Sequence, residues 1–438
     1  MSATTAAANR AEIFSWHFMP WPHLDESFEK NHESGWITIP NAQFDRDQAR
    51  GLFQEYIDEL AQADELGFDG VVLNEHHQNI YGLMPSPNII AGALTQRMKH
   101  GKIVVLGNLV PLHFRPLRVA EEYAMLDCMT GGRIVAGFAP GGGHEPFSYS
   151  YSPALARERF WEGIDLIVQA WTKPGPTSFY GRHYQMRYVN PWPQPLQTPH
   201  PPIWVPGANS EETMFEVARR GFCYFVSTRA KLGGVVRSTR RFEEIVGEVG
   251  GTFHPRRLGL LLSVYVAETD EIARAESEQA IFYFTRYCLK GHLRRAGRRL
   301  TMAPGGLSPE SYKSYLEHSN PADKLLGDAE NWQDIDNMGS IIVGSPETVR
   351  HKLAQFIDEA HIGNLLIQFH IGNLSRELTM KNQKIFAESV LPHLRRDSQT
   401  LFERKYPDTA ATPAATPAAT PTPTPRAAKS KSAKNAPA

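Results

Sequence analysis

Four consecutive polar residues, Asn74-Glu75-His76-His77, carry the side chains best suited to acid-base chemistry in this sequence of 438 residues. They follow the apolar run 70–73, which is typical of a buried strand. Successive side chains of a strand point to opposite faces, so Asn74 and His76 share one face and Glu75 takes the other. Because an imidazole titrates near neutral pH, His76 is the candidate acid-base residue. His77 is interpreted as structural or as part of the pocket edge.

Two histidines beside a carboxylate are also a common set of metal ligands. Adjacent histidines on an extended strand diverge, however, and the segment lacks the H-E-x-x-H spacing of a helical zinc site. We therefore expect no metal here. A purely structural histidine pair is the other alternative to a catalytic role.

Two further segments contain residues that could hold an anion or a flat ring. In the loop FAPGGGHEPF, glycines 141–143 could turn backbone N–H groups toward an anion, although a glycine run is equally typical of a plain flexible loop. The segment 203–221 predicts a strand, a short loop and a helix that begins at Asn209 or Ser210. Hydroxyl groups at a helix N-terminus form a ready phosphate site, so Ser210 and Thr213 are candidate phosphate ligands. The alternative is an ordinary helix cap.

Short apolar runs alternate with segments of helical period along the chain. This alternation predicts parallel strands joined by crossover helices. Eight runs are candidate strands, the number that closes a TIM-type (β/α)8 barrel, and such barrels build their sites at the C-terminal ends of the strands. The predicted strands are 13–19, 70–75, 103–110, 133–139 and the runs that begin at Ile203, Phe222, Leu258 and Asn364.

Cap and stop residues agree with three of the predicted helices. The segment 51–68 places apolar residues on one face, with acidic residues and glutamines opposite, and ends at Gly67. The segment 115–133 begins at Pro116 and ends near Gly131 and Gly132, and 345–363 has Ser345 as N-cap, Pro346 at its first position and Gly363 at its end. The predicted buried face of the first helix comprises Phe53, Tyr56, Ile57 and Leu60.

Asp127 and Arg133 flank the turn between a helix and a strand, away from the predicted barrel mouth. We expect them to form a structural pair.

Two insertions, 172–202 and 280–338, interrupt the alternation. Both could form lids or walls over the barrel mouth, or decorate the surface. The first is rich in aromatic residues, which would favour an apolar or ring-containing substrate if they line the site and otherwise form a packed structural cluster. These aromatic residues are Phe179, Tyr180, Tyr184, Tyr188 and Trp192.

The composition is that of an ordinary globular protein, with 41% apolar and 21% charged residues. A net charge of −1 without a dense basic stripe argues against nucleic acid or an anionic membrane as partner and favours a small molecule. Three widely spaced cysteines suggest a reducing compartment, and we expect a cytoplasmic enzyme. The expected organisation is an N-terminal extension (1–12), a barrel domain (13–400) and an Ala/Thr/Pro-rich disordered tail (408–438).

Taken in order, several segments resemble the bacterial luciferase-like family of flavin-dependent monooxygenases, over about residues 13–394. These segments are LNEHH, VAEEYAMLDCMTGGRIVAGF, PGANSEET and GSPETVRHKLAQF. The resemblance implies that reduced FMN is the cofactor, O2 the co-substrate and a small organic molecule the substrate. A separate NAD(P)H-dependent reductase is the expected partner, because the chain has no G-x-G-x-x-G after a strand. The resemblance also suggests dimers or tetramers.

The resemblance assigns roles to the candidate residues. It gives His76 the catalytic role of forming or using a flavin hydroperoxide, and it places phosphate contacts at Ser210 and Thr213. Family members often carry an arginine where this chain has Pro140, and Arg157 or Arg159 could substitute for it. The remaining expected flavin contacts are Asn74, Glu75, Asn108, Ala139, Gly141, Gly207, Ala208 and Asn209.

Two other functions remain open from the sequence. A dehydrogenase or reductase that uses a deazaflavin would transfer hydride without consuming oxygen. A flavin-binding barrel without turnover is the alternative outside enzymology.

Overall fold

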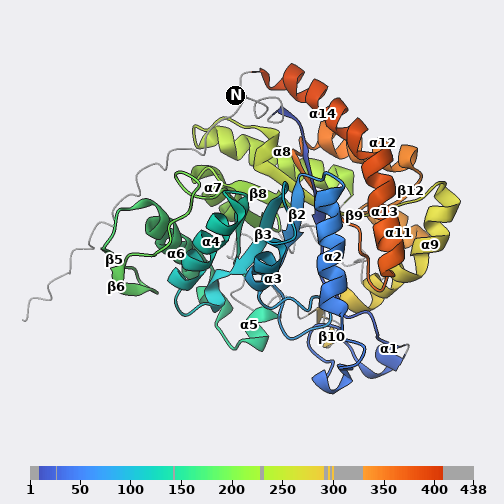
Figure 1. Ribbon diagram of the computed structural model, residues 1–438, viewed down its shortest axis with the longest axis horizontal. Coiled ribbons are helices and arrows are strands. Elements are labelled where there is room, and N and C mark those ends of the chain that lie inside the picture. The colour runs from blue at the N-terminus through green and yellow to red at the C-terminus, as the bar shows by residue number, and fades with distance from the viewer. Residues whose placement is uncertain are drawn as a thin grey trace, which may run out of the picture.

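The strands of this chain form a closed parallel barrel surrounded by helices (Figure 1). The computed structural model describes residues 9–25, 27–141, 144–226, 231–290, 294–295, 298–299 and 329–407. The barrel order is β1-β2-β3-β4-β7-β8-β9-β13, and β13 pairs with β1 to close the ring. Its strands are β1 (Glu12–Trp16), β2 (Gly70–Leu73), β3 (Lys102–Leu109), β4 (Ile134–Ala139), β7 (Ile203–Gly207), β8 (Cys223–Val226), β9 (Leu258–Val266) and β13 (Asn364–Gln368).

All eight predicted strands are therefore confirmed, with ends that differ by a few residues. A ninth strand, β12 (Ile341–Gly344), was not predicted. β12 and β8 share one edge of β9: β8 pairs with the first three residues of β9, and β12 pairs with the last four. The strand escaped prediction because its apolar run is only three residues long and is bounded by glycine and serine.

The barrel interior is filled by large side chains that reach across it. Phe14 and Trp16 of β1 contact Trp204 of β7 and Phe225 of β8, with ring centroids 5.5 and 5.8 Å apart. Side chains at alternate positions therefore face outward, toward the helices. The main helices are α2 (Leu52–Glu65), α3 (Pro87–Leu94), α4 (Leu117–Thr130), α6 (Pro153–Thr172), α7 (Glu211–Arg219), α8 (Leu232–Glu248), α9 (Asp270–Tyr283), α12 (Pro346–Glu359), α13 (Arg376–Ser389) and α14 (Leu391–Lys405).

The predicted helix boundaries are close to those observed. Gly67 and Gly131 follow α2 and α4 with φ of 81° and 67°, left-handed values that glycine adopts without strain. Ser345 caps α12 by accepting a hydrogen bond from the backbone N–H of Thr348 at 3.4 Å. The predicted end of α12 at Gly363 is wrong, because the helix ends at Glu359.

The predicted buried face of α2 is partly wrong. Tyr56 and Leu60 are buried, but Phe53 is 41% exposed. Glu59 and Asp64 are buried in its place, because each accepts hydrogen bonds there: Glu59 from two imidazoles and Asp64 from the backbone N–H groups of residues 99–101.

The expected pair of Asp127 and Arg133 is also wrong. The Asp127 carboxylate accepts hydrogen bonds from the backbone and side chain of Gln197, and Arg133 donates to the carbonyls of Met98 and Gly101. Both residues stabilise loops at the N-terminal end of the barrel, but through different partners.

The first insertion lies outside the barrel mouth. It forms the hairpin β5 (Thr177–Tyr180) and β6 (Gln185–Val189), whose turn donates three backbone N–H groups to Glu162 of α6. Figure 1 shows this hairpin at the outer side of α6, far from α1 (Ser27–Asn31) and α5 (Glu145–Ser148). Surface decoration is thus the correct alternative, and the hairpin gives no evidence about the substrate.

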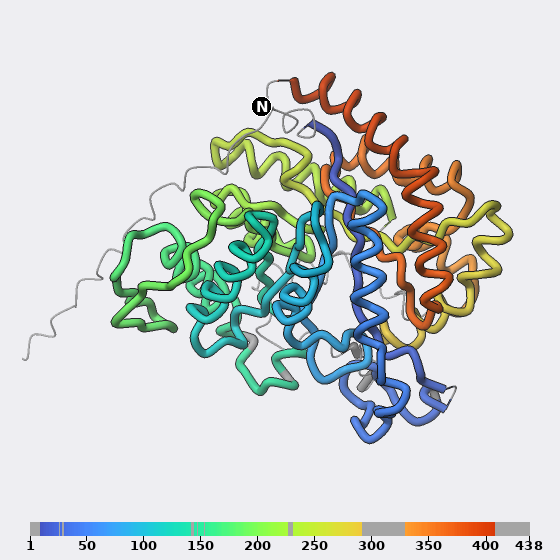
Figure 2. Tube along the Cα trace, in the orientation of Figure 1, coloured from blue at the N-terminus to red at the C-terminus, as the bar shows by residue number. Residues whose placement is uncertain are grey.

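Most of the second insertion, residues 291–293, 296–297 and 300–328, lies outside the described residues. Its first part, residues 283–290, packs on the segment 18–36 at the mouth. The hydroxyl of Tyr283 donates to the carbonyl of Trp21 at 2.7 Å, and the Trp36 indole donates to the carbonyl of Cys288 at 2.6 Å. Figure 2 shows the segment 17–51 at the same lower end of the molecule as α5. Residues 283–290 therefore form part of the wall of the mouth.

Among the described residues, no helix is both long enough and apolar enough to cross a bilayer.

Candidate active site

The four polar residues after β2 lie at the C-terminal end of the barrel, as predicted. Asn74 is buried, and neither its amide nitrogen nor its amide oxygen has a hydrogen-bond partner among the described residues. A buried amide without partners is costly, so such a group in a site is explained best by a ligand that completes its hydrogen bonds. Asn74 is therefore the side chain here that most clearly requires an absent partner.

Glu75 faces away from that position and is held by the protein. One carboxylate oxygen accepts hydrogen bonds from the Asn108 amide and the Leu109 backbone N–H, both at 3.1 Å. The other oxygen lies 2.7 Å from Nε2 of His77, whose Nδ1 lies 2.8 Å from the Tyr149 hydroxyl. These contacts give Glu75 and Asn108 a supporting position, and the direct flavin contacts expected of both residues stay predictions.

His76 is the partly exposed histidine of the pair, with 22% of its side chain exposed. Its Nδ1 lies 3.3 Å from a carboxylate oxygen of Glu145, a residue of α5 that is itself buried. A carboxylate at Nδ1 favours a proton on that nitrogen, which leaves Nε2 as the nitrogen available for proton transfer. The structure thus gives His76 an orienting partner that the sequence analysis did not name.

The residues around Glu145 determine the protonation state of His144, a second histidine beside this carboxylate. The Asn79 oxygen accepts hydrogen bonds from the backbone N–H groups of Tyr81 and Gly82, which fixes the orientation of the amide. Its nitrogen therefore donates to Nε2 of His144 at 2.8 Å. Burial lowers the pKa of His144 to about 4, against the attraction of Glu145. His144 is therefore neutral at physiological pH.

Aromatic side chains form a wall beside His76. The ring of Tyr81 lies 4.6 Å from the imidazole and that of Phe18 lies 6.3 Å from it. Phe284 and Trp36 pack on the same group, at 6.4 and 5.4 Å from Tyr81. None of these rings was singled out from the sequence. They come from three segments that the barrel brings together, so no local pattern indicates them.

The predicted phosphate residues surround the N-terminus of α7. Asn209, just before the helix, has a left-handed φ of 65°, and its oxygen accepts a hydrogen bond from Ser238 at 2.6 Å. Ser210 is the N-cap residue, but its hydroxyl does not cap the helix, which counts against the simple cap alternative. Thr213 lies one turn further on. Gly207 ends β7, and a Cβ there would come within 2.4 Å of the Tyr224 ring.

An arginine does reach this helix end. Nη2 of Arg157, in α6, lies 3.5 Å from the Ser210 hydroxyl, and its guanidinium forms an ion pair with Glu212. Arg159 instead lies over the ring of Tyr184, 5.6 Å from its centroid. Of the two arginines considered, Arg157 is therefore the one placed to neutralise an anion at Ser210.

The loop after β4 is described only in part. Ala139 pairs with Leu109 at the end of the strand, and Gly141 has a left-handed φ of 79°. Glycines 142 and 143 lie outside the described residues. Glu145 follows them on the same strand-end loop, so the strand-end rule could have singled it out together with the glycines.

These features fit a flavin. The buried Asn74 amide can bind polar ring atoms, the aromatic wall suits a flat heterocycle, and Ser210 with Arg157 suits a phosphate. The fold and site together define a TIM-type barrel with an acid-base site at its mouth.

Comparison with known proteins assigns the chain to a family. A family model described as "Luciferase-like monooxygenase" matches residues 33–361. The chain therefore belongs to the luciferase-like monooxygenase family, which confirms the resemblance seen in its sequence.

One curated relative and two solved structures are similar to this chain, and the two structures share its fold. The oxygenase component of flavin-dependent trigonelline monooxygenase from Acinetobacter baylyi is 29% identical over 249 residues, 55% of this chain and 66% of that protein. The match thus spans slightly less than two thirds of that relative. Among solved structures, the oxygenating constituent of 3,6-diketocamphane monooxygenase from Pseudomonas putida, in complex with FMN, has a TM-score of 0.65 at 20% identity and covers 87% and 98% of the two chains. A dehydrogenase of secondary alcohols that depends on coenzyme F420 has a TM-score of 0.60 at 14% identity, covering 88% and 99%.

Proposed function

We propose that the protein is an FMN-dependent monooxygenase that oxygenates a small, ring-containing organic molecule with O2. The observation that carries the proposal is His76, oriented by Glu145 and placed beside the unpartnered amide of Asn74 in a member of this family. The trigonelline and diketocamphane relatives, both monooxygenases by name, support the same chemistry.

The proposed cofactor site runs from Asn74 to the N-terminus of α7. Asn74 would meet the polar edge of the flavin ring, Gly207 and Ala208 would let the cofactor pass close to the backbone, and Ser210, Thr213 and Arg157 would hold the phosphate. Bound reduced FMN supplies the activation of oxygen. It would come from a separate flavin reductase, as the words "oxygenase component" in the name of the trigonelline relative suggest.

The protein would position the reactants, exclude water and control one proton. Glu145 holds the imidazole of His76 through Nδ1, so that Nε2 can give or take a proton during oxygen transfer. Phe18 and Tyr81 shield this side of the site from water. The same aromatic wall favours a flat or cyclic apolar substrate.

Anaerobic titration with reduced FMN, followed by rapid mixing with O2, tests the proposal. We expect saturable binding and oxygen uptake, with organic product formed from a panel of cyclic ketones and N-methylated heteroaromatic acids when a flavin reductase is supplied. Binding of coenzyme F420 with hydride transfer and no oxygen uptake would instead support the deazaflavin alternative. Flavin binding without turnover of any panel member would favour a binding protein.

Two further parts of the proposal concern the state of the protein in the cell. We propose a cytoplasmic homo-oligomer, which gel filtration with light scattering and cell fractionation would test.

A further inference from the structure

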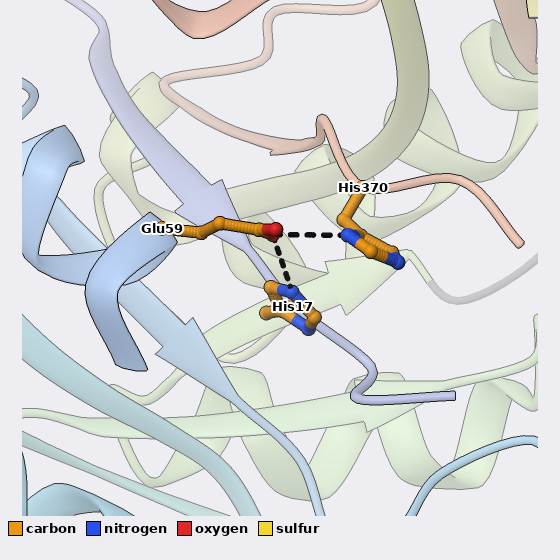
Figure 3. A group of neighbouring side chains, drawn as sticks. All are labelled: His17, Glu59 and His370. Atoms are coloured by element: carbon orange, nitrogen blue, oxygen red, sulfur yellow. Dashed lines mark hydrogen bonds and ion pairs between the residues drawn. The ribbon is translucent and has the colours of Figure 1, made fainter. Parts of the chain in front are cut away.

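A second group of acid-base side chains lies behind the wall of the site. Figure 3 shows His17, which follows β1, and His370, which follows β13, both directed at Glu59 of α2. Nε2 of His17 and Nδ1 of His370 lie 3.0 and 2.9 Å from the same carboxylate oxygen. All three side chains are at least 96% buried, and the proposed chemistry uses none of them.

The donor set matches a metal site in residue type, but the hydrogen bonds do not. The backbone N–H of Met19 donates to Nδ1 of His17 at 2.8 Å, so Nδ1 carries the lone pair and Nε2 carries the proton. A metal ligand needs a lone pair on the nitrogen that faces the ion, and here Nε2 faces Glu59 as a donor. The group is therefore a hydrogen-bonded anion with imidazole donors. Burial alone would raise the pKa of Glu59, but His370 and His17 outweigh it and lower that pKa to about 2.

The hydrogen bond to Met19 extends this group to the mouth. Met19 has a left-handed φ of 54°, a conformation that a non-glycine residue keeps only when neighbouring contacts hold it. Nδ1 of His17 supplies one such contact. The carbonyl of Met19 accepts a hydrogen bond from Leu83 at 2.7 Å, and Trp21 donates to the carbonyl of Ile80 at 2.9 Å. The segment 17–21 is thus fastened to the loop that follows His76.

Phe18, between His17 and Met19 in the chain, connects the turn at residues 17–19 to His76. Its ring is nearly parallel to that of His76, with centroids 6.3 Å apart, and is tilted against the ring of Tyr81 at 4.7 Å. Tyr81 in turn lies 4.6 Å from His76. The backbone contact is close as well, since a Cβ at Gly82 would lie 3.0 Å from the carbonyl oxygen of Phe18 and 3.2 Å from Cβ of His76. The position of the His76 ring therefore depends on where the turn at residues 17–19 is held.

We propose that Glu59 is a positioning residue for His76. It fixes His17 in the tautomer that accepts from Met19, and the turn so held sets the position of Phe18 beside Tyr81 and His76. The inference rests on the proposed function, because it takes His76 as the acid-base residue. The same carboxylate joins the ends of β1 and β13 to α2 through His17 and His370, which explains why an acidic residue occupies the buried face of that helix.

Two pairs of variants separate positioning from mere stability. Glu59→Leu removes the acceptor, whereas Glu59→Gln can keep a carbonyl oxygen where the shared carboxylate oxygen stands. His17→Gln loses the acceptor at Nδ1, whereas His17→Asn can keep an acceptor for the Met19 N–H. The matched control is Asp64→Asn, since Asp64 is a buried carboxylate on the same helix but binds the backbone at residues 99–101, away from the mouth.

The measurement is a pH titration of His76 in flavin-free protein, monitored by NMR of isotope-labelled histidine. The His76 signal is assigned by its absence from the spectrum of His76→Gln. We expect Glu59→Leu and His17→Gln to move the His76 midpoint by about half a pH unit or more. Glu59→Gln and His17→Asn should keep it near that of the parent protein. Asp64→Asn should lower the melting temperature and leave the midpoint unchanged.

Three results would overturn the proposal: an unmoved His76 midpoint in His17→Gln, an equal shift in both His17 variants, or one equivalent of zinc that the parent protein binds and His17→Gln does not. If Glu59→Leu does not fold, the two His17 variants still decide, because both keep Glu59. The measurement needs neither FMN nor substrate, so a protein that fails to oxygenate anything would contradict the proposed function and leave this result standing.

Discussion

Nδ1 of His76 lies 3.3 Å from a carboxylate oxygen of Glu145, and the two residues come from loops after different strands of the barrel. The sequence indicated the first residue and not the second, and the proposed chemistry depends on both. A histidine held at one nitrogen by a carboxylate has the other nitrogen free for proton transfer.

Replacing His76 by Gln should separate cofactor binding from oxygenation. We expect coupled product formation to fall by about 10²- to 10⁴-fold, the usual contribution of a general acid or base. Affinity for reduced FMN should change little, because the phosphate and ring contacts remain. Product and released hydrogen peroxide would be measured together under steady-state turnover. Glu145→Gln should show a smaller loss, and unchanged coupling in His76→Gln would remove His76 from the mechanism.

Replacing Asn74 should lower the affinity for FMN without lowering the stability of the flavin-free protein. Asn74→Ala should weaken FMN binding by about tenfold, since one or two hydrogen bonds to the ring would be lost. Stability without flavin should stay constant or increase, because the amide has no partner there. Asn382 is the matched control, since its amide bonds the backbone at residues 264 and 266. Asn382→Ala should lower the melting temperature and leave the affinity of the folded protein unchanged. Fluorescence titration and thermal unfolding would measure both quantities.

The eight strands and the position of Asn74 and His76 could be predicted because they depend on local alternation and on one rule about barrel ends. The direction of each side chain on β2 follows from strand parity alone. Glu59 could not be placed, because an acidic residue on a helix is normally exposed and its imidazole partners lie 42 and 311 residues away along the chain. The aromatic wall from Phe18, Tyr81 and Phe284 was hidden for the same reason. The sequence left open whether the hairpin at 177–189 covers the mouth or the outer surface, because that depends on where α6 carries it in space.

Acid should destabilise the folded protein through His144. Burial lowers its pKa to about 4, below the ordinary value of 6.5, so between these two pH values the unfolded chain binds more protons than the folded one. The stabilisation is complete above pH 6.5 and is lost as the pH falls toward 4, by about 3 kcal/mol at most. Urea unfolding at pH 7 and pH 5 would measure it. His144→Gln, which can keep an acceptor for Asn79, should show a shallower pH dependence, and an identical slope would contradict the assignment.

Arg157 should discriminate FMN from riboflavin. It lies 3.5 Å from the Ser210 hydroxyl at the N-terminus of α7. A guanidinium on a phosphate forms charge-assisted hydrogen bonds, so Arg157→Gln should weaken FMN binding by about tenfold and leave riboflavin binding nearly unchanged. Arg159→Gln is the matched control, because that side chain lies over Tyr184 instead. The ratio of the two dissociation constants, measured by flavin fluorescence in each variant, decides between the arginines. An equal loss for both flavins in Arg157→Gln would show that Arg157 supports the fold of the loop and not the phosphate.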